Sequence, residues 1–535
     1  MSKLSRWEVC IGLEIHAQIQ SVAKLFSGSS AASKGGSLVP NSRVSFFDAA
    51  LPGTLPVVNT ACVQQALRTA RALQSDVQLR SVFERKHYFY CDLPLGYQIT
   101  QQRAPIATNG VLKFQVQEAK PRAQTTFSSR KEKNAALKAQ KDQGMSDTSV
   151  HRFMPRVAAD EWVEKQVRVN RIQIEQDSGK NIHSLDATHV DLNRAGTGLM
   201  EIVFEPDLRS AAEAGQVLRE VQHLLRHIGT CDGNMEDGSM RCDLNVSVRP
   251  KPTSPDEDVP FGERVEVKNM NSIKNLMKAV EYEMERQVEL ITTTGGCIEK
   301  ETRTFDAATG MTKRMRTKEG AKDYRFFPEP DLPPLVISQS FVDEALASLP
   351  ELPDKMKARL CAMYGLSAYE ASVLVLTPGA VEYFEAVCAD VSRPHKLVTN
   401  WVLNDLFALL KATNTSIAES PVSPERLGQL IDLVVNESIS GKMAKDVIEL
   451  MYYEDARGPA DIVQEKGWSQ ITDEAELRRF CEAVLAEPKA QRNVAAYRGG
   501  KTQLFGFFIG QVMKASGGRV HPEKTNEIMR SLLDA

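Results

Sequence analysis

Two short segments that flank a glycine-containing turn, within residues 171–207, restrict the fold more than any other part of the chain. In the second segment, MEIVFEP, apolar side chains alternate with polar ones, which places Glu201 and Glu205 on the same face. The first segment, RIQIE, predicts isoleucines turned inward and Gln173 and Glu175 turned outward. A period of two is typical of a strand with one buried face. The sequence therefore predicts two half-buried strands with carboxylates on the polar face, although an ordinary solvated sheet face would explain either strand alone.

The turn between these strands contains Asn193, Gly196 and Gly198. Because glycine has no Cβ, the backbone at such positions can approach another group closely. We therefore predict that this turn lets the chain approach a bound ligand.

Three further segments alternate in the same way and add charged side chains to polar faces. A lone strand histidine is more often a surface group than a ligand, but an acid two residues away on the same face favours metal or phosphate chemistry. Glu14 and His16 lie at polar positions of EVCIGLEIHAQI. Arg241 and Asp243 lie at polar positions of SMRCDLNVSVR, and Glu266 and Lys268 at those of RVEVKNMN.

The five predicted strands thus each offer a carboxylate, namely Glu14, Glu175, Glu201, Asp243 and Glu266. So many acids on one surface would repel one another unless cations neutralised them, and Mg²⁺ takes oxygen ligands of this kind. Nearby arginine and lysine side chains could hold nucleotide phosphates. If the strands are neighbours in one antiparallel sheet, they predict a magnesium-dependent phosphoryl-transfer site.

Composition narrows the class of protein. The chain has 535 residues and a net charge of −3, which indicates a soluble multidomain protein and argues against a general nucleic-acid coat, while a local basic surface could still hold a specific RNA. Its nine cysteines include no C-x-x-C pair, so neither a zinc ribbon nor a disulfide framework is expected, and a reducing compartment fits best. No apolar run has the length of a membrane span, and no long targeting segment is expected, with a trimmed presequence as the alternative.

Helical patterns surround and follow the predicted strands. Residues 60–73 and 272–292 have amphipathic spacing, and Ser210 with Glu213 forms a capping-box sequence before another helix. Past PEPDLPP the apolar spacing is helical throughout. We therefore expect an α+β fold in which a catalytic cradle domain with an antiparallel sheet precedes two all-helical domains, with the boundaries 1–335, 336–462 and 463–535.

Within the first domain, residues 120–141 hold seven Lys or Arg and one acid, which predicts a disordered basic insertion over about 118–166, with RNA contact as the alternative role. The aromatic run HYFYCDLPLGYQIT suggests core packing or a rigid loop, with adenine or tRNA contact as the alternative. Two motifs are rejected. His223 and His227 lack the glutamate of a zinc protease, and Gly500-Lys501-Thr502 lacks the preceding strand of a P-loop.

Several long motifs resemble, in order, those of one family. IGLEIHAQIQ, DLPLGYQITQ, EQDSGK, DLNRAGTGLMEI, GSMRCDLNVSVR, VEVKNMNS and GQVMKASGG are similar to the signatures of the B subunit of the glutamyl-tRNA(Gln)/aspartyl-tRNA(Asn) amidotransferase, the GatB family. The resemblance covers nearly the whole chain. It implies a cradle domain similar to glutamine synthetase and a YqeY-like helical tail that contacts tRNA.

The resemblance also implies the activity. A heterotrimer of this kind contains an amidase (A) subunit, which frees ammonia from glutamine, and a small (C) subunit or an equivalent. The B subunit uses ATP and Mg²⁺ to phosphorylate the glutamate on Glu-tRNA(Gln), and ammonia then gives Gln-tRNA(Gln). By matching motifs, the implied metal site is Glu14, His16, Glu175, Glu201, Asp243 and Glu266. Of these, Glu14, His16 and Glu201 are expected to act directly in catalysis, while Arg241 and Lys268 are physical inferences for phosphate or substrate contact.

Three departures from the family pattern carry information. Where some members have a Cys-rich zinc site before LPGTLPVVN, this chain reads RVSFFDAA, so we expect no zinc. The motif that commonly reads EED is Glu175-Gln176-Asp177, which puts a role for the second acid in doubt. Together with the basic insertion, these departures favour an organellar member in the mitochondrial matrix, with the bacterial cytoplasm or a plastid as alternatives.

Other functions stay open at this point. The substrate could be Asp-tRNA(Asn) as well as Glu-tRNA(Gln). A metal-dependent hydrolase would use the same acids to activate water and would need no ATP. A non-catalytic tRNA-binding scaffold would tolerate Glu201→Gln.

Overall fold

The computed structural model describes residues 6–31, 39–118, 161–252, 254, 259–317, 324–468, 471, 473–517 and 519–534. These residues form two compact units, Met1–Leu352 and Pro353–Ala535, which we treat separately. The first unit is mixed α and β and the second is helical, so the predicted α+β class with helices at its C-terminal end is confirmed.

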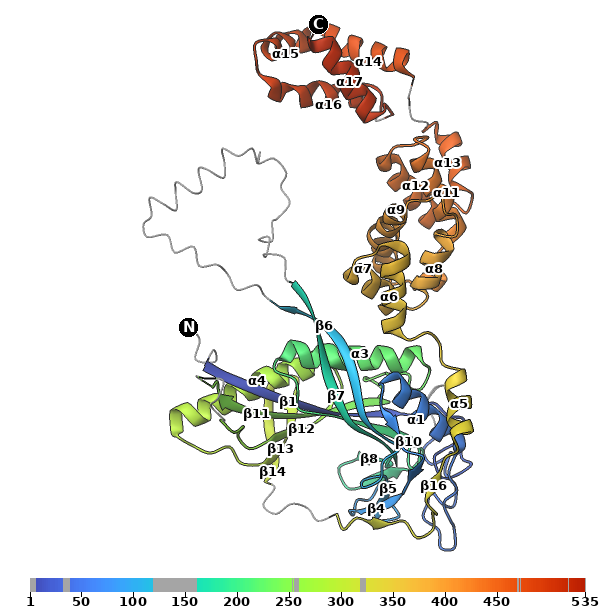
Figure 1. Cartoon of the computed structure of the whole chain (residues 1–535), viewed down its shortest axis with the longest axis vertical. Helices are drawn as coiled ribbons and strands as arrows, with labels where there is room; N and C mark the ends of the chain where they lie inside the picture. Colours follow the sequence, from blue (N-terminus) through green and yellow to red (C-terminus); the bar gives the residue numbers. More distant parts are fainter. Residues whose placement is uncertain are drawn as a thin grey trace. The chain divides into compact units, whose positions relative to one another are not determined.

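The first unit is built on a nine-stranded sheet (Figure 1). Neighbouring strands are antiparallel except for one parallel pair, β12 with β13. The five strands that were predicted to carry carboxylates are consecutive in this sheet. In spatial order the strands are β14 (Met311–Thr317), β13 (Glu301–Asp306), β12 (Val265–Met270), β11 (Met240–Pro250), β1 (Trp7–Gln18), β10 (Gly198–Phe204), β7 (Glu161–Gln176), β6 (Ala107–Glu118) and β2 (Asp76–Val77).

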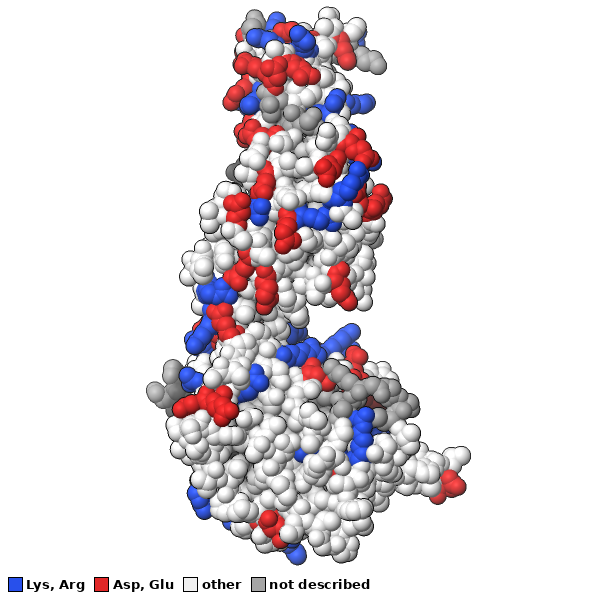
Figure 2. Space-filling view, turned by 90° about the vertical axis from the view of Figure 1, so that its right-hand side faces the viewer, with Lys and Arg blue, Asp and Glu red and all other residues white. Residues whose placement is uncertain are grey.

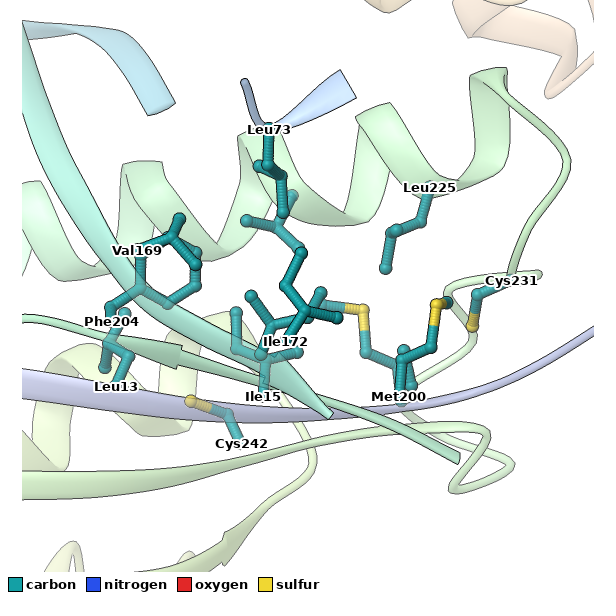
Figure 3. Close-up of a cluster of buried hydrophobic side chains, with 14 of the residues drawn as sticks. Leu13, Ile15, Leu73, Val169, Ile172, Met200, Phe204, Leu225, Cys231 and Cys242 are labelled. Atoms are coloured by element: carbon teal, nitrogen blue, oxygen red, sulfur yellow. The ribbon is translucent and has the colours of Figure 1, made fainter. Parts of the chain in front are cut away.

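Helices cover the apolar face of this sheet. They are α1 (Thr60–Ala72), α3 (Ala211–His227) and α4 (Ile273–Thr294), and α5 (Gln339–Ala347) packs on α1. Alternation of apolar residues along the strands and helical spacing along the helices place both sets in one core. Figure 3 shows part of this core, with side chains from β1, β10 and β7 meeting Leu73 and Leu225.

The start of α3 confirms the predicted cap in part. The Ser210 hydroxyl accepts a hydrogen bond from the Glu213 N–H at 3.2 Å. The reciprocal bond of a capping box is absent, because the Glu213 carboxylate instead accepts from the Arg209 N–H at 2.7 Å and from Lys165 Nζ at 2.8 Å.

A small three-stranded sheet covers part of the polar face of the large sheet. It consists of β15 (Phe327–Pro328), β4 (Glu84–His87) and β5 (Tyr97–Thr100), and in Figure 1 β4 and β5 lie on the opposite side of the large sheet from α3 and α4. Gln98 joins the two sheets, since its Nε2 donates to the Gln176 carbonyl at 2.8 Å. Two short ribbons complete the unit, β3 (Arg80–Ser81) with β16 (Leu335–Val336), and β8 (Lys180–His183) with β9 (Thr188–Asp191).

The glycine-containing turn closely approaches another part of the chain, and its approach to a ligand stays a prediction. Gly196 has φ +81°, and a Cβ there would lie 2.5 Å from Asp48 Oδ1. Asp48 is buried and pairs with the fully buried Lys24 at 3.1 Å. The small size of Gly196 is therefore required by the loop RVSFFDAA, the segment in which a zinc site was not expected.

The structure also corrects the predicted C-terminal bound of the disordered basic insertion. Residues 161–166 belong to β7 and pair with residues 113–118 of β6, so they are ordered. The remainder of the predicted disordered segment, residues 119–160, lies outside the described residues.

The second unit contains two separate hydrophobic cores. The helices of the first core are α6 (Pro353–Tyr364), α7 (Ala368–Leu376), α8 (Ala380–Val387), α9 (His395–Asn400), α10 (Phe407–Thr413), α11 (Pro424–Val435), α12 (Gly441–Tyr453) and α13 (Pro459–Lys466), with a π-helical turn, Trp401–Leu406, between α9 and α10. Those of the second core are α14 (Glu474–Ala486), α15 (Pro488–Arg498), α16 (Phe505–Ala515) and α17 (Pro522–Asp534).

The sequence analysis excluded a P-loop and a membrane-spanning segment. The helix α15, which ends at Arg498, precedes the Gly-Lys-Thr run where a P-loop would have a strand, so the rejection of a P-loop is confirmed. Within the described residues, no helix is long and apolar enough to cross a membrane. Figure 2 shows positive and negative side chains interspersed on the visible face of the helices.

Candidate active site

A histidine and two glutamates meet at the centre of the polar sheet face. His16 on β1 lies directly across from Glu201 on β10, and Glu175 on β7 pairs with Leu199, two residues before Glu201. Directly opposite and diagonal residues on one face of a sheet are close enough to interact. His16 Nε2 is 3.8 Å from Glu175 Oε1 and 3.9 Å from Glu201 Oε2. Cross-strand register therefore brings together three of the predicted site residues.

Both glutamates of this triad are buried but hydrogen-bonded. Glu175 is 2% exposed and Glu201 is 7% exposed. The Thr100 hydroxyl donates to Glu175 Oε2 at 3.2 Å, and Gln173 Nε2 donates to Glu201 Oε2 at 2.6 Å. Buried carboxylates are costly unless such partners are present. Thr100 and Gln173 were not predicted as site residues, although Gln173 was placed on the polar face of its strand and Thr100 ends the aromatic run HYFYCDLPLGYQIT.

The environment separates the pKa values of the two carboxyl groups. Burial, together with the negative charge of Glu201, raises the pKa of Glu175 to about 7. Burial also acts to raise the pKa of Glu201, but His16 and Lys86 outweigh it and hold that pKa below its usual range. Close carboxylates that share a site behave in this way because both cannot ionise at low cost. Near neutral pH the pair therefore holds up to one proton, which a bound cation would displace.

The remaining predicted metal ligands form a second group on β1, β11 and β12. Glu14 pairs with Asp243 across the β1–β11 ladder, and Asn245 Nδ2 donates to Glu14 Oε1 at 3.1 Å. Burial, followed by the charges of Glu201, Asp243 and Glu266, raises the pKa of Glu14. Lys268 Nζ lies 3.1 Å from a carboxylate oxygen of both Asp243 and Glu266. These acids are on the same sheet face as the triad, but a lysine already pairs with two of them.

Arg241 is held by an acid of the EQD motif. Its guanidinium lies 3.1 Å from Asp177, and Arg194 approaches the same carboxylate at 3.4 Å. Asp177 is the main cause of the raised pKa of Arg241. The acid at position 177 thus balances two arginines, and the structure does not place it with the triad.

A cavity of about 340 Å³ adjoins the site. Its lining is aromatic and cationic and consists of Lys86, Tyr88, Tyr90, Lys268, Thr302, Met315 and Tyr324. The aromatic run around residue 89 was expected to form core packing or a rigid loop. Tyr90 borders this cavity and Phe89 is 85% exposed, so core packing is wrong for this part of the run, which lies outside helices and strands.

Lys86 is a site residue that sequence reasoning missed. It lies on β4, faces the cavity, and is partly buried near Glu175 and Glu201. Burial acts to lower its pKa, but the two glutamates raise it above its usual range. No local pattern marks this residue, because it reaches the triad through the packing of one sheet on another.

Among the described residues, His16, Glu175 and Glu201 form the one group of three potential metal ligands whose donor atoms all lie within 4.8 Å of one another. One imidazole nitrogen and two carboxylates suit a divalent cation. With a cationic, aromatic cavity beside them, these residues could position a phosphate-bearing substrate next to a metal ion.

The chain matches two protein-family models. The model described as "GatB/GatE catalytic domain" matches residues 9–343, and the model described as "GatB domain" matches residues 382–533. The chain is 58% identical to the B subunit of the mitochondrial glutamyl-tRNA(Gln) amidotransferase of Phytophthora infestans, over 99% of this chain and 95% of that protein.

Bacterial relatives are similar over the same length. The B subunits of the aspartyl/glutamyl-tRNA(Asn/Gln) amidotransferases of Acidiphilium cryptum and Rickettsia felis are each 44% identical to this chain. The matches cover 98% and 99% of this chain and 96% and 98% of those proteins. The triad lies within the matched catalytic domain, and the chain belongs to the GatB family of amidotransferase B subunits.

Proposed function

We propose that this chain is the subunit of a tRNA-dependent amidotransferase that activates the side-chain carboxylate of Glu-tRNA(Gln) with ATP for conversion to Gln-tRNA(Gln). Membership of the family supports the reaction. The observation that carries the assignment of the site is the triad of His16 with the buried Glu175 and Glu201, beside the cationic cavity.

The chemistry explains why such a site needs both acids and cations. A carboxylate oxygen is a poor leaving group toward ammonia. Transfer of the terminal phosphoryl group of ATP to that oxygen releases ADP and gives an acyl phosphate; ammonia then attacks the carbonyl carbon, phosphate leaves, and loss of a proton yields the amide. Negative charge spreads over the phosphoryl oxygens during transfer, so positioned positive charge lowers the barrier.

The residues present fit a divalent cation such as Mg²⁺. His16, Glu175 and Glu201 would hold it, and Glu14 is proposed as a further ligand because it lies two residues before His16 on the same strand face. The bound cation would neutralise phosphate charge. Asp243 and Glu266, also predicted as ligands, lie in the group that Lys268 bridges.

The cavity supports a proposed place for the nucleotide. Lys268 lines it and is proposed to contact phosphate. Arg241 is proposed for the same role more weakly, because Asp177 occupies its guanidinium. A likeness of this domain to glutamine synthetase is proposed on the shared reaction, carboxylate activation.

The partners are proposed from the family. They are an amidase (A) subunit, a small (C) subunit or its equivalent, and tRNA(Gln) charged with glutamate. Within the proposed domains 1–335, 336–462 and 463–535, the last is proposed to contact tRNA. The name of the Phytophthora relative supports the mitochondrial matrix as the location, with the bacterial cytoplasm or a plastid as alternatives.

Asp-tRNA(Asn) is a second candidate substrate, since the names of the bacterial relatives include both tRNAs. A scaffold without catalytic function and a metal-dependent hydrolase are the remaining candidate functions. They differ from the main proposal in their need for ATP and for Glu201.

The deciding experiment measures ADP release by the reconstituted complex with Mg²⁺, ATP and Glu-tRNA(Gln), with and without ammonia. We expect release to depend on charged tRNA and to be lost in Glu201→Gln. The matched control is Glu205→Gln, because Glu205 lies just past β10 and bonds Asn170 instead of the triad. ADP release that does not depend on Glu201 would favour a scaffold. Hydrolytic turnover without ATP would favour a hydrolase.

A further inference from the structure

Lys268 lies between two acids of the polar sheet face. Its Nζ is 3.1 Å from Asp243 Oδ2 on β11 and 3.1 Å from Glu266 Oε1 on its own strand, β12. The Asp243 and Glu266 side chains are 9% and 12% exposed. The buried carboxylate of Asp243 and the largely buried carboxylate of Glu266 thus share one ammonium group.

The other oxygen of each of these two carboxylates also has a donor. The Asn269 N–H donates to Asp243 Oδ1 at 2.9 Å, and the Thr302 hydroxyl donates to Glu266 Oε2 at 3.1 Å. All four oxygens are therefore already hydrogen-bonded, which is the condition for keeping buried charges paired without a metal.

The triad differs in this respect. Its glutamates are at least as buried, yet none of the described Lys or Arg nitrogen atoms lies within 4 Å of Glu175 or Glu201. His16, which can be a neutral ligand, is the nearest basic group. A lysine thus pairs directly with Asp243 and Glu266, whereas Lys86 lies near the triad without pairing with its glutamates, and the triad remains suited to a cation.

We infer that the Lys268 ammonium is a built-in cation that takes the place of a second divalent ion between Asp243 and Glu266. The inference rests on the proposed function and deepens it. The acidic surface then binds one divalent ion, at the triad, and its positive charge on the other side comes from the chain itself. An ammonium has three donors, of which the two acids use two, so the third is available to a phosphate oxygen in the cavity that Lys268 lines.

The test counts Mn²⁺ ions bound per chain, by equilibrium dialysis with electron paramagnetic resonance of free Mn²⁺, using the full-length chain purified with its partner subunits. Lys268→Met removes the charge and keeps the length of the side chain. We expect one more bound Mn²⁺ per chain in this variant than in the wild type. Lys268→Arg keeps the charge and should leave the count unchanged.

Two further variants make the comparison secure. Lys268→Gln keeps a hydrogen-bond donor between the carboxylates without charge; it should gain the same ion, and it replaces the Met variant if that variant does not fold. Lys313→Met removes the lysine from an exposed pair with Asp306 and should gain none.

The difference between variant and wild type decides the inference, whatever the wild-type count. Equal counts in Lys268→Met, Lys268→Gln and the wild type would overturn it. The proposed triad site is decided separately, because it requires an ion in the wild type that His16→Ala loses. Ions bound by partner subunits cancel in both comparisons.

Discussion

His16 and Glu201 face each other across the β1–β10 ladder, with Nε2 and Oε2 3.9 Å apart. The two residues are separated by most of a domain in sequence, and their meeting depends on the antiparallel pairing of β1 and β10. The pairing helps to bring potential ligand atoms of one imidazole and two carboxylates within 4.8 Å of one another, and one of these carboxyl groups has a pKa near neutrality. The properties of this triad lead to the first two predictions.

The first prediction concerns Gln173, which donates to Glu201 at 2.6 Å and orients that carboxylate. Groups that orient a metal ligand typically change metal affinity by about 10- to 100-fold when they are removed. Gln173→Leu should therefore weaken Mn²⁺ binding at the triad by a factor in this range, measured by titration calorimetry. Gln117→Leu, at an exposed position of β6, should not change the affinity. Unchanged affinity in Gln173→Leu would show that Glu201 does not hold the ion.

The second prediction concerns pH. The pKa of Glu175 is raised to about 7, so the cation-free folded state holds a proton that the unfolded state loses near pH 4.5. This contribution to stability is present below the unfolded pKa and is lost as the pH rises through about 7.

A cation must displace that proton, so its affinity should rise as the pH increases from 6 toward 7, with release of up to one proton per ion. Calorimetry in buffers of different ionisation enthalpy measures this release. Glu175→Gln should abolish it. Cation binding to the wild type without proton release near pH 6 would contradict the predicted role of Glu175.

The third prediction concerns the buried pair of Lys24 and Asp48. Removing one partner leaves an unpaired buried charge, which typically costs about 3 to 5 kcal/mol. Asp48→Ala should lower the free energy of unfolding by this amount, measured by denaturant titration. The control is Glu164→Ala, which breaks an exposed pair with Lys113 and should cost less than about 1 kcal/mol. Equal effects of the two variants would contradict a structural role for the buried pair.

The fourth prediction concerns the helical tail. Trp468 packs on the first helical core, whereas α14 to α17 have a core of their own. Truncation after Trp468 should therefore leave the rest folded and weaken tRNA binding. Because phosphate contacts release counterions, the truncated protein should also show a smaller salt dependence. Filter binding at two salt concentrations measures both effects, and unchanged affinity would place tRNA recognition elsewhere in the chain.

The sequence analysis identified most of the polar sheet face because alternation is a local property. The period of two in MEIVFEP and EVCIGLEIHAQI decides which side chains face the helices, and burial of Leu13, Ile15, Met200 and Ile202 confirms it. The same patterns could not show that β12, β11, β1, β10 and β7 are neighbours, nor that β10 ends before Glu205.

The sequence by itself therefore determined the class of fold, the family and the set of acids from which a site is built. Tertiary structure decided how those acids are divided. Cross-strand register places Glu175 and Glu201 with His16. Lys268 pairs with Asp243 and Glu266. Lys86 and Thr100 approach the triad from a separate small sheet. The physical reason is that a strand's own residues set the face on which a side chain lies, whereas its neighbours on that face are set by pairing and packing of segments far apart in the chain.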